Sequence, residues 1–327
     1  MNKKFWKNKK ILITGHTGFK GGWLTVFLNL IGSKVSGFAL NPEGKNNFFN
    51  KVNVKKLLTY DFRHDISDLN YLKKSLKKIK PEIIFHLAAQ SSVIESFKNP
   101  IDTIKSNILG TSNILEAVKS NKNVKCLIII TTDKVYQNYK TKKIFKEGSM
   151  LGGDDVYSGS KAGCEIIANS FRKSFFKNSN CKIATVRAGN CFGGGDWTKD
   201  RIVKDSLECF SKNKNLILRM PDATRPWQHV IEPLYGYILL AEKLTSKTGN
   251  QFAKAWNFGP STRQNMKVIN LVSLIKKQMQ TNSRILIKRQ FKKINKKYTS
   301  FESKYLNIDS SNVFKACLLY TSDAADD

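Results

Sequence analysis

The chain up to Asn190 alternates short apolar segments with amphipathic stretches of helical period. This alternation is typical of βαβ units, in which each helix returns the chain to the next strand of a parallel sheet. It predicts an α/β fold with a doubly wound parallel sheet of the Rossmann type. The predicted strands cover 10–14, 34–40, 57–62, 82–87, 124–131 and 181–187, and the predicted helices cover 19–31, 69–79, 100–120 and 156–176.

After Asn190 the alternation loosens into glycine-rich loops and shorter elements. We therefore expect a first domain over 1–189, a smaller region over 190–312, and a C-terminal tail over 313–327. A Lys/Asn-rich stretch over 280–300 is expected to be exposed.

The composition is that of a folded, non-membrane chain. Hydrophobic residues make up 41% of the 327 residues, enough for one large core or two modest ones. Lys, Asn or Gly breaks each apolar run too early for it to span a bilayer, so we expect no membrane partner. The six cysteines include no C-x-x-C pair and no metal-ligand spacing. They predict reduced thiols, no metal site and a cytoplasmic location.

The formal net charge of +31 allows two interpretations. A basic surface attracts the phosphates of nucleic acids. However, nine of the 56 basic residues are Arg and the 47 Lys are scattered along the whole chain. Proteins that read nucleic acids use Arg for paired contacts and cluster their charge. We therefore favour a solvated surface produced by drift toward Lys in an AT-rich genome, and expect no nucleic-acid partner. A non-catalytic basic protein that binds nucleotides or nucleic acid is the alternative from a different class.

Three glycines spaced three apart, Gly15, Gly18 and Gly21, follow the first predicted strand. Such glycines let the backbone turn and approach a pyrophosphate, while the N-terminus of the next helix offers unpaired N–H groups. The loop therefore predicts dinucleotide binding, with a plain turn as the alternative. The candidate residues are Gly15, Thr17, Gly18, Phe19, Lys20 and Gly21.

The end of the second predicted strand, Phe38-Ala-Leu-Asn41, has neither an acid for ribose hydroxyls nor a base for a 2′-phosphate. The sequence therefore favours NAD without establishing it. Asp65 and Ile66, after the third strand, are candidates for the adenine site, although Asp65 also fits a simple helix cap.

Tyr157 and Lys161 stand four residues apart at the start of a predicted helix. Side chains at this spacing share one face, so the ammonium is expected to lower the pKa of the phenol and make it a usable base. The same spacing also occurs within 136–140 and 139–143. Those segments fall in a polar loop past the fifth strand, so we take Tyr157 and Lys161 as catalytic.

Thr132, Asp133 and Lys134 stand at the end of the fifth predicted strand. Removing water from a sugar needs two proton carriers, one that protonates the departing hydroxyl and one that takes a proton from carbon. Asp133 and Lys134 supply two such groups. Taken alone, they fit a turn cap and a solvated lysine equally well.

Together these segments resemble the CDP-glucose 4,6-dehydratases, NAD-dependent sugar-nucleotide epimerase/dehydratase enzymes of the extended short-chain dehydrogenase/reductase superfamily. The matching segments run in order from residue 10 to residue 312. The most specific are Gly193-Gly-Gly-Asp-Trp197 and Arg225-Pro-Trp-Gln-His-Val230. The similar dTDP-glucose dehydratases carry Asp-Glu where this chain has Asp133-Lys134. The other matching segments are 15–21, 86–90, 132–136, 157–162, 187–190, 200–201 and 256–260.

The resemblance implies an NAD-dependent lyase that converts CDP-glucose to its 4-keto-6-deoxy form, a first step towards the deoxy sugars of surface polysaccharide. Tyr157, with Lys161, would take the proton of the C4 hydroxyl while hydride passes from C4 to NAD and later returns to C6. Thr132 would hydrogen-bond the C4 oxygen. A protonated Asp133 would donate to the leaving C6 hydroxyl, and Lys134 would act at C5. The loop that would line the cofactor beside the glycines is formed by Leu87, Ala88 and Ala89.

The remaining candidates would contact the sugar nucleotide. Arginine makes paired hydrogen bonds to phosphate, so the Arg residues suit a diphosphate. The two Trp residues would stack on the base or else lie in the core. We regard His229 as structural. The substrate candidates are Gln90, Asn190, Gly195, Trp197, Arg201, Arg225 and Trp227.

Three further expectations come from the family. The resemblance assigns NAD binding to residues 1–189 and sugar-nucleotide binding to 190–312, and it implies a homodimer. The tail over 313–327 departs from the family pattern, and we expect truncation or read-through there. The alternative activities are a dTDP-glucose 4,6-dehydratase and a sugar-nucleotide 4-epimerase. An epimerase needs no proton carriers at C5 and C6, so Asp133 and Lys134 argue against it.

Overall fold

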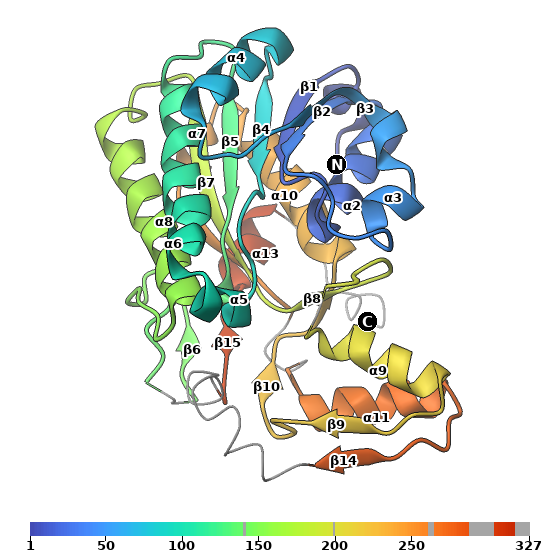
Figure 1. Cartoon of the computed structure of the whole chain (residues 1–327). Coiled ribbons are helices and arrows are strands. Elements are labelled where there is room, and N and C mark those ends of the chain that lie inside the picture. Colours follow the sequence, from blue (N-terminus) through green and yellow to red (C-terminus); the bar gives the residue numbers. More distant parts are fainter. Residues whose placement is uncertain (140–141, 199, 261–264, 288–303, 318–327) are drawn as a thin grey trace.

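The computed structural model describes residues 1–139, 142–198, 200–260, 265–287 and 304–317 (Figure 1). Seven parallel strands form the central sheet in the order β12-β7-β5-β4-β1-β2-β3. The order reverses between β1 and β4, and ligands of doubly wound sheets bind at the carboxyl ends of the strands at such a point. The strands are β1 Lys10–Thr14, β2 Lys34–Ala39, β3 Leu58–Arg63, β4 Ile83–His86, β5 Cys126–Ile130, β7 Lys182–Ala188 and β12 Ala255–Phe258.

Two hydrophobic cores lie on opposite faces of this sheet, because successive residues of a strand point to opposite sides. On β1, Ile11 and Ile13 pack with the helices of one face, and Leu12 packs with the helices of the other. Figure 1 shows these two helical layers around the sheet. The first layer contains α2 Phe19–Leu30, α10 Ile231–Leu244 and α13 Ser311–Cys317, and the second contains α4 Leu69–Ile79, α7 Gly110–Lys119 and α8 Val156–Ser174.

The predicted helix over 100–120 forms as α6 (Pro100–Ile104), a π-helical turn (Lys105–Leu109) and α7. Single π-helical turns inside α-helices are frequent at functional sites. Asn107, in this turn, donates hydrogen bonds from Nδ2 to the backbone carbonyl of Gln90 (3.1 Å) and to Ser160 Oγ (2.8 Å). The turn therefore joins the loop after β4 to helix α8.

In its described part, the region after residue 190 contributes short strands that form pairs, one of them with β6 from before residue 190, and two helices that pack on each other. Helix α9 (Ile202–Ser211) packs on α11 (Val268–Gln278). The strand pairs are β8 Cys191–Phe192 with β11 Gln228–His229, β10 Thr224–Arg225 with β13 Met266–Lys267, β9 Leu216–Leu218 with β14 Ile285–Ile287, and β6 Ile144–Phe145 with β15 Asn307–Ile308. The remaining short helices are α1 Lys3–Trp6, α3 Phe48–Lys51, η1 Val54–Leu57, α5 Val93–Lys98, η3 Asp133–Val135 and η4 Gly249–Phe252.

Three elements from beyond residue 190 return to the central sheet. Strand β12 pairs with β7, and helices α10 and α13 pack on the face that carries Ile11. Val313, the start of the predicted tail, is 1% exposed in that core. Residues 318–327 of the tail and 288–300 of the Lys/Asn-rich stretch lie outside the described residues.

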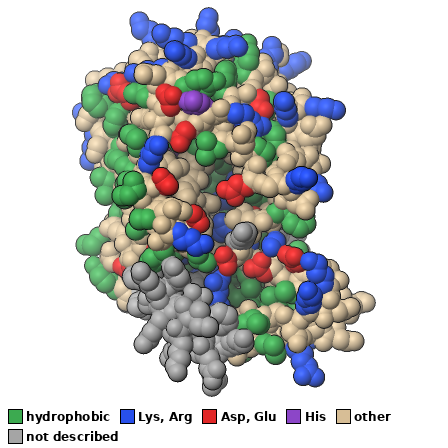
Figure 2. Space-filling model, in the orientation of Figure 1, with side chains coloured by type: hydrophobic (Ala, Val, Ile, Leu, Met, Phe, Trp, Pro, Cys, Tyr) green, Lys and Arg blue, Asp and Glu red, His purple; other side chains and the backbone are tan. Residues whose placement is uncertain are grey.

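Lys and Arg side chains are spread over the face in Figure 2, with Asp and Glu between them. Within the described ranges, no helix is long and apolar enough to cross a membrane. Five described cysteines are free thiols.

Candidate active site

The glycine loop between β1 and α2 has room only for glycine at two positions. Gly15 has φ +76°, and a Cβ there would lie 2.7 Å from the backbone nitrogen of Ala88. A Cβ on Gly21 would lie 2.2 Å from the carbonyl oxygen of Gly15. Helix α2 begins after Gly18, and no side chain caps its first N–H groups. A close backbone approach and uncapped N–H groups at a helix start fit a dinucleotide diphosphate.

The loop after β4 closes over these glycines. The backbone N–H of Ala88, between Leu87 and Ala89, donates to Thr14 Oγ1 over 3.2 Å. Thr14 Oγ1 also lies 2.8 Å from His86 Nδ1. Burial, followed by the charge of Lys161, lowers the pKa of His86 to about 3, so this imidazole is neutral. The predicted loop therefore lies beside the glycines.

Polar residues at the ends of β2 and β3 form a cluster that the sequence did not reveal. Asp61 Oδ1 lies 2.9 Å from His16 Nε2 and accepts a bond of 2.7 Å from Arg63 Nε. Burial alone would raise the pKa of Asp61, but these hydrogen bonds lower it to about 2. Thr17 donates from Oγ1 to the carbonyl of Leu40 over 3.1 Å. A carboxylate on β3 therefore lies beside the glycine loop, where His16 and Arg63 hold it.

Asp65 and Ile66 lie in the loop before α4. Asp65 Oδ1 accepts a bond from the Ser67 backbone (2.8 Å), whereas Asp68 caps the helix. The alternative in which Asp65 caps the helix is therefore wrong. Ile66 is buried and contacts the position of Gly110. An adenine site at Asp65 and Ile66 stays a prediction.

Tyr157 and Lys161 lie on helix α8, as predicted, and are 8% and 6% exposed. Tyr157 hydrogen-bonds with Thr132. Lys161 Nζ donates to the carbonyl of Ile130 at the end of β5 over 3.1 Å. Helix α8 therefore carries both groups to the carboxyl edge of the sheet.

The expected lowering of the Tyr157 pKa is wrong for this structure. Burial raises the pKa of Tyr157 to about 12, and the hydrogen bond with Thr132 and the charge of Arg201 only partly offset it. Lys161 is itself buried, which lowers its own pKa. Its ammonium is aimed at the Ile130 carbonyl rather than at the phenol.

Asp133 follows β5 and is 2% exposed. Thr132 Oγ1 donates to its Oδ1 over 3.1 Å, and its Oδ2 is buried with no hydrogen-bond partner. Burial raises the pKa of Asp133, despite the charges of Lys134 and Arg225. This direction agrees with an acid that is held protonated.

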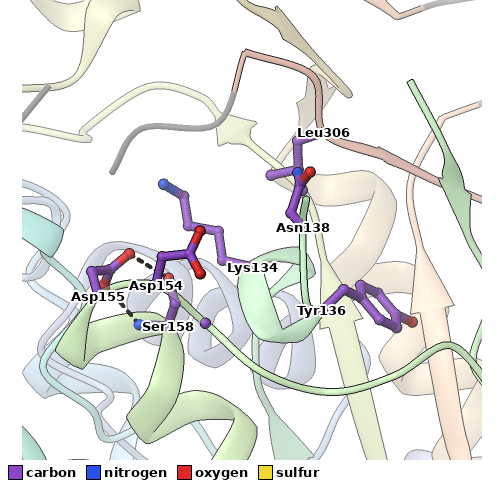
Figure 3. A pocket seen from close by; sticks show the side chains of 8 residues that line it. Lys134, Tyr136, Asn138, Asp154, Asp155, Ser158 and Leu306 are labelled. Carbon is purple, nitrogen blue, oxygen red and sulfur yellow. Dashed lines mark hydrogen bonds between the residues drawn. The ribbon is translucent and has the colours of Figure 1, made fainter. Parts of the chain in front are cut away.

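Lys134 leaves the same turn but is half-buried and lines a pocket (Figure 3). Figure 3 shows the Lys134 side chain pointing away from the Tyr136 ring. The pocket is lined by Lys134, Tyr136, Asn138, Gly153, Asp154, Asp155, Ser158 and Leu306. Asp155 caps α8 by accepting from the Ser158 backbone (2.9 Å), so this pocket adjoins the start of the helix that carries Tyr157 and Lys161.

The other two Tyr–Lys pairs do not form comparable sites. Tyr136 is buried, and its hydroxyl donates to Asn257 Oδ1 over 2.5 Å. Tyr139 is 70% exposed. Neither tyrosine lies in a helix, and Lys140 falls outside the described residues.

Several predicted substrate residues are already bonded within the protein. The Gln90 side chain donates from Nε2 to Thr103 Oγ1 (2.8 Å) and accepts from the Ser92 backbone. A Cβ on Gly195 would lie 2.5 Å from the Phe48 ring, so this glycine packs against α3. The carbonyl of Asn190 accepts from the Gln228 backbone over 3.0 Å.

The arginines and tryptophans predicted to bind substrate differ in how deeply they are buried. Arg225 is buried, and its charge acts on Asp133. Arg201 is exposed, and its charge acts on Tyr157. Trp197 is 49% exposed, which excludes a core role, whereas Trp227 is partly buried and donates to the Met266 carbonyl over 3.1 Å.

A buried ion pair beneath the site was missed by the sequence reasoning. Arg187 Nη2 lies 2.8 Å from Glu165 Oε2, and the two side chains are 4% and 2% exposed. Glu165 stands four residues after Lys161 on α8. Helical spacing would have placed it on the same face as Tyr157 and Lys161.

The sheet order, the uncapped glycine loop and the Tyr–Lys helix define the class of the extended short-chain dehydrogenases/reductases. The family model described as GDP-mannose 4,6 dehydratase matches residues 12–316. The chain therefore belongs to this family of nucleotide-sugar 4,6-dehydratases.

The relatives include CDP-glucose 4,6-dehydratase of Salmonella typhimurium, which is 43% identical over 265 residues, or 80% of this chain and 73% of that protein. Among solved structures, dTDP-glucose 4,6-dehydratase from Bacillus anthracis in complex with NAD has a TM-score of 0.75 at 19% identity, and the match covers 94% of this chain.

 The covered share of the Bacillus anthracis chain is 89%. UDP-glucose 4-epimerase from Thermotoga maritima with UDP-glucose has a TM-score of 0.77 at 20% identity, and the match covers 93% of this chain and 91% of that one. At these identities the solved structures support the fold alone.

Proposed function

We propose that this protein is an NAD-dependent CDP-glucose 4,6-dehydratase, a hydro-lyase that forms the 4-keto-6-deoxy sugar nucleotide. The observation that carries the proposal is Asp133. It is a buried carboxyl with a raised pKa beside Thr132, and Thr132 also hydrogen-bonds with Tyr157. An oxidation at C4 needs the tyrosine, and only a dehydration also needs an acid there. The 43% identity to a CDP-glucose enzyme supports this substrate.

The residues present fit NAD at the glycine loop. Gly15 and Gly21 would allow the backbone approach, and the uncapped N–H groups at the N-terminus of α2 would hold the diphosphate. Bound there, NAD would supply a hydride acceptor for C4 and a donor for C6.

The chain's own groups would handle the protons. Tyr157 would remove the C4 hydroxyl proton, and Thr132 would hold the C4 oxygen. Asp133, protonated because it is buried, would protonate the C6 hydroxyl as it leaves as water. Lys134, on the adjoining pocket, would take the C5 proton. Among the substrate candidates, Arg201 and Arg225 have the charge for the diphosphate.

Mass spectrometry of the products tests this proposal. The protein is incubated with NAD and, separately, with CDP-glucose, dTDP-glucose and GDP-mannose. We expect loss of one water from CDP-glucose alone, and Tyr157→Phe should abolish turnover while NAD still binds. Water loss from a different donor alone would overturn the substrate, and full activity of Tyr157→Phe would overturn the mechanism.

We also propose a cytoplasmic homodimer. Four apolar side chains stand exposed on the face formed by α6, the π-helical turn and α8, namely Ile101 (72%), Ile104 (41%), Leu109 (44%) and Ile166 (56%). Light scattering of Ile166→Lys should then show monomer. Leu30→Lys is the matched control, because Leu30 is 79% exposed at the end of α2 on the opposite face of the sheet. A monomeric wild-type protein would refute the dimer.

A further inference from the structure

The turn that carries Asp133 and Lys134 is hydrogen-bonded on both sides to one buried ion pair. Thr131, just before the turn, donates from Oγ1 to Glu165 Oε1 over 2.5 Å. Tyr136, just after it, accepts at its hydroxyl from Arg187 Nη1 over 2.9 Å. Glu165 and Arg187 are themselves paired at 2.8 Å. The residues on both sides of the segment Thr132–Val135 are therefore hydrogen-bonded to the same Glu165–Arg187 pair.

The pair also ties this turn to the helix that carries the catalytic tyrosine. Glu165 stands on α8 one turn beyond Lys161 and two turns beyond Tyr157. Arg187 stands on β7, next to β5 in the sheet. One carboxylate thus connects the strand end that presents Asp133 with the helix that presents Tyr157.

Stability alone is a weak reason for such a pair. Desolvating two charges is costly, and replacing a buried pair with apolar residues is often neutral or stabilising. Arg187 Nε is buried without a hydrogen-bond partner, a further cost. Burial would lower the pKa of Arg187, but Glu165 raises it above its ordinary value, so the guanidinium stays charged.

We propose that the Glu165–Arg187 pair positions Asp133 and Lys134 against Tyr157 for the dehydration step. This inference rests on the proposed function. Lys134 and Asp133 leave the chain between Thr131 and Tyr136, so the bonds of these two residues to the ion pair hold the turn from which both side chains leave. The pair acts through Thr131 and Tyr136 and does not itself touch the substrate.

Two matched variants distinguish a role in positioning Asp133 and Lys134 from a role in stabilising the fold. Thr131→Val removes the bond that Thr131, just after β5, makes to Glu165, together with its 3.1 Å bond to the carbonyl of Val186. Thr185→Val removes a similar bond, from Thr185 Oγ1 to Glu165 Oε2 (2.7 Å), on strand β7, which carries none of the proposed proton carriers. Rapid-quench mass spectrometry of single turnovers distinguishes a sugar nucleotide that has lost two hydrogens from one that has lost water.

For Thr131→Val we expect water loss to slow by about ten- to a hundredfold, as small misplacements of reacting groups do. The oxidised sugar that still carries its C6 hydroxyl should then accumulate, with KM and NAD affinity unchanged. Thr131→Ser should restore the wild-type pattern, and Thr185→Val should match the wild type.

Equal effects of the two valine variants, or equal slowing of oxidation and water loss in Thr131→Val, would overturn the inference. If Thr131→Val does not fold, Tyr136→Phe provides the same comparison from the other side of the turn. A wild-type protein that removes water from none of the three donors would instead defeat the proposed function, and the inference with it.

Discussion

Replacing Gly21 with alanine tests how closely the glycine loop is built for a dinucleotide. The new Cβ would lie 2.2 Å from the carbonyl oxygen of Gly15, where an ordinary contact begins at about 3.4 Å. The loop and the start of α2 must therefore separate by about 1 Å. Hydrogen bonds to charged groups contribute about 1.5–3 kcal/mol each. Losing one or two of them should weaken NAD binding by about 3 kcal/mol, or roughly a hundredfold.

Titration calorimetry with NAD measures this loss. Gly22→Ala is the matched control, because its Cβ meets the Phe48 ring, a side chain that can move, at 2.6 Å. We expect Gly22→Ala to bind NAD within about threefold of the wild type, since its contact lies away from the loop backbone. Wild-type NAD affinity in a folded Gly21→Ala protein would refute this account of the loop.

Three further predictions concern stability. Burial raises the pKa of Asp133 in the folded protein. Ionising this carboxyl therefore lowers the stability of the fold, in full above the raised pKa and not at all below the ordinary pKa of a carboxyl group. Thermal unfolding of Asp133→Asn should therefore show a higher Tm than the wild type at alkaline pH, and the gain should vanish by about pH 3.5; a gain independent of pH would contradict this. Arg187→Met should cost about 3–5 kcal/mol in denaturant unfolding, because it leaves Glu165 buried and unpaired, and adding Glu165→Leu should recover most of it. Gly159→Ala, on helix α8 with nothing within 4 Å of the added Cβ, should stabilise by about 0.5–1 kcal/mol.

The parallel sheet could be predicted because each of its strands and helices has a hydrophobic pattern that is visible within a short stretch of sequence. Strand β1 and helix α4 have the predicted bounds, the helix predicted over 100–120 is divided by a π-helical turn, and the other predicted elements differ by only a few residues at their ends. Strand β12 was missed because four residues after a loop-rich stretch carry no period. Its pairing with β7 is a long-range contact that no sequence window contains.

The site was predictable where the chemistry lies in short motifs and not where it depends on the packing of distant segments. The glycine loop and the Tyr157–Lys161 pair are of the first kind. The raised pKa of Tyr157 is of the second, because it depends on burial contributed by several elements. The same is true of Asp61, whose partner His16 lies 45 residues away in the chain.

The raised pKa values of Asp133 and Tyr157 belong together. Burial is the largest cause of both, and the charge of Asp133 is a further cause that raises the Tyr157 pKa. An Asp133 that holds its proton carries no such charge, so proton loss from Tyr157 becomes easier. The two groups therefore titrate as a coupled pair. The coupling disfavours the state in which both groups are ionised, so a protonated Asp133 makes Tyr157 a better base, as a C6 acid and a C4 base in one buried site require.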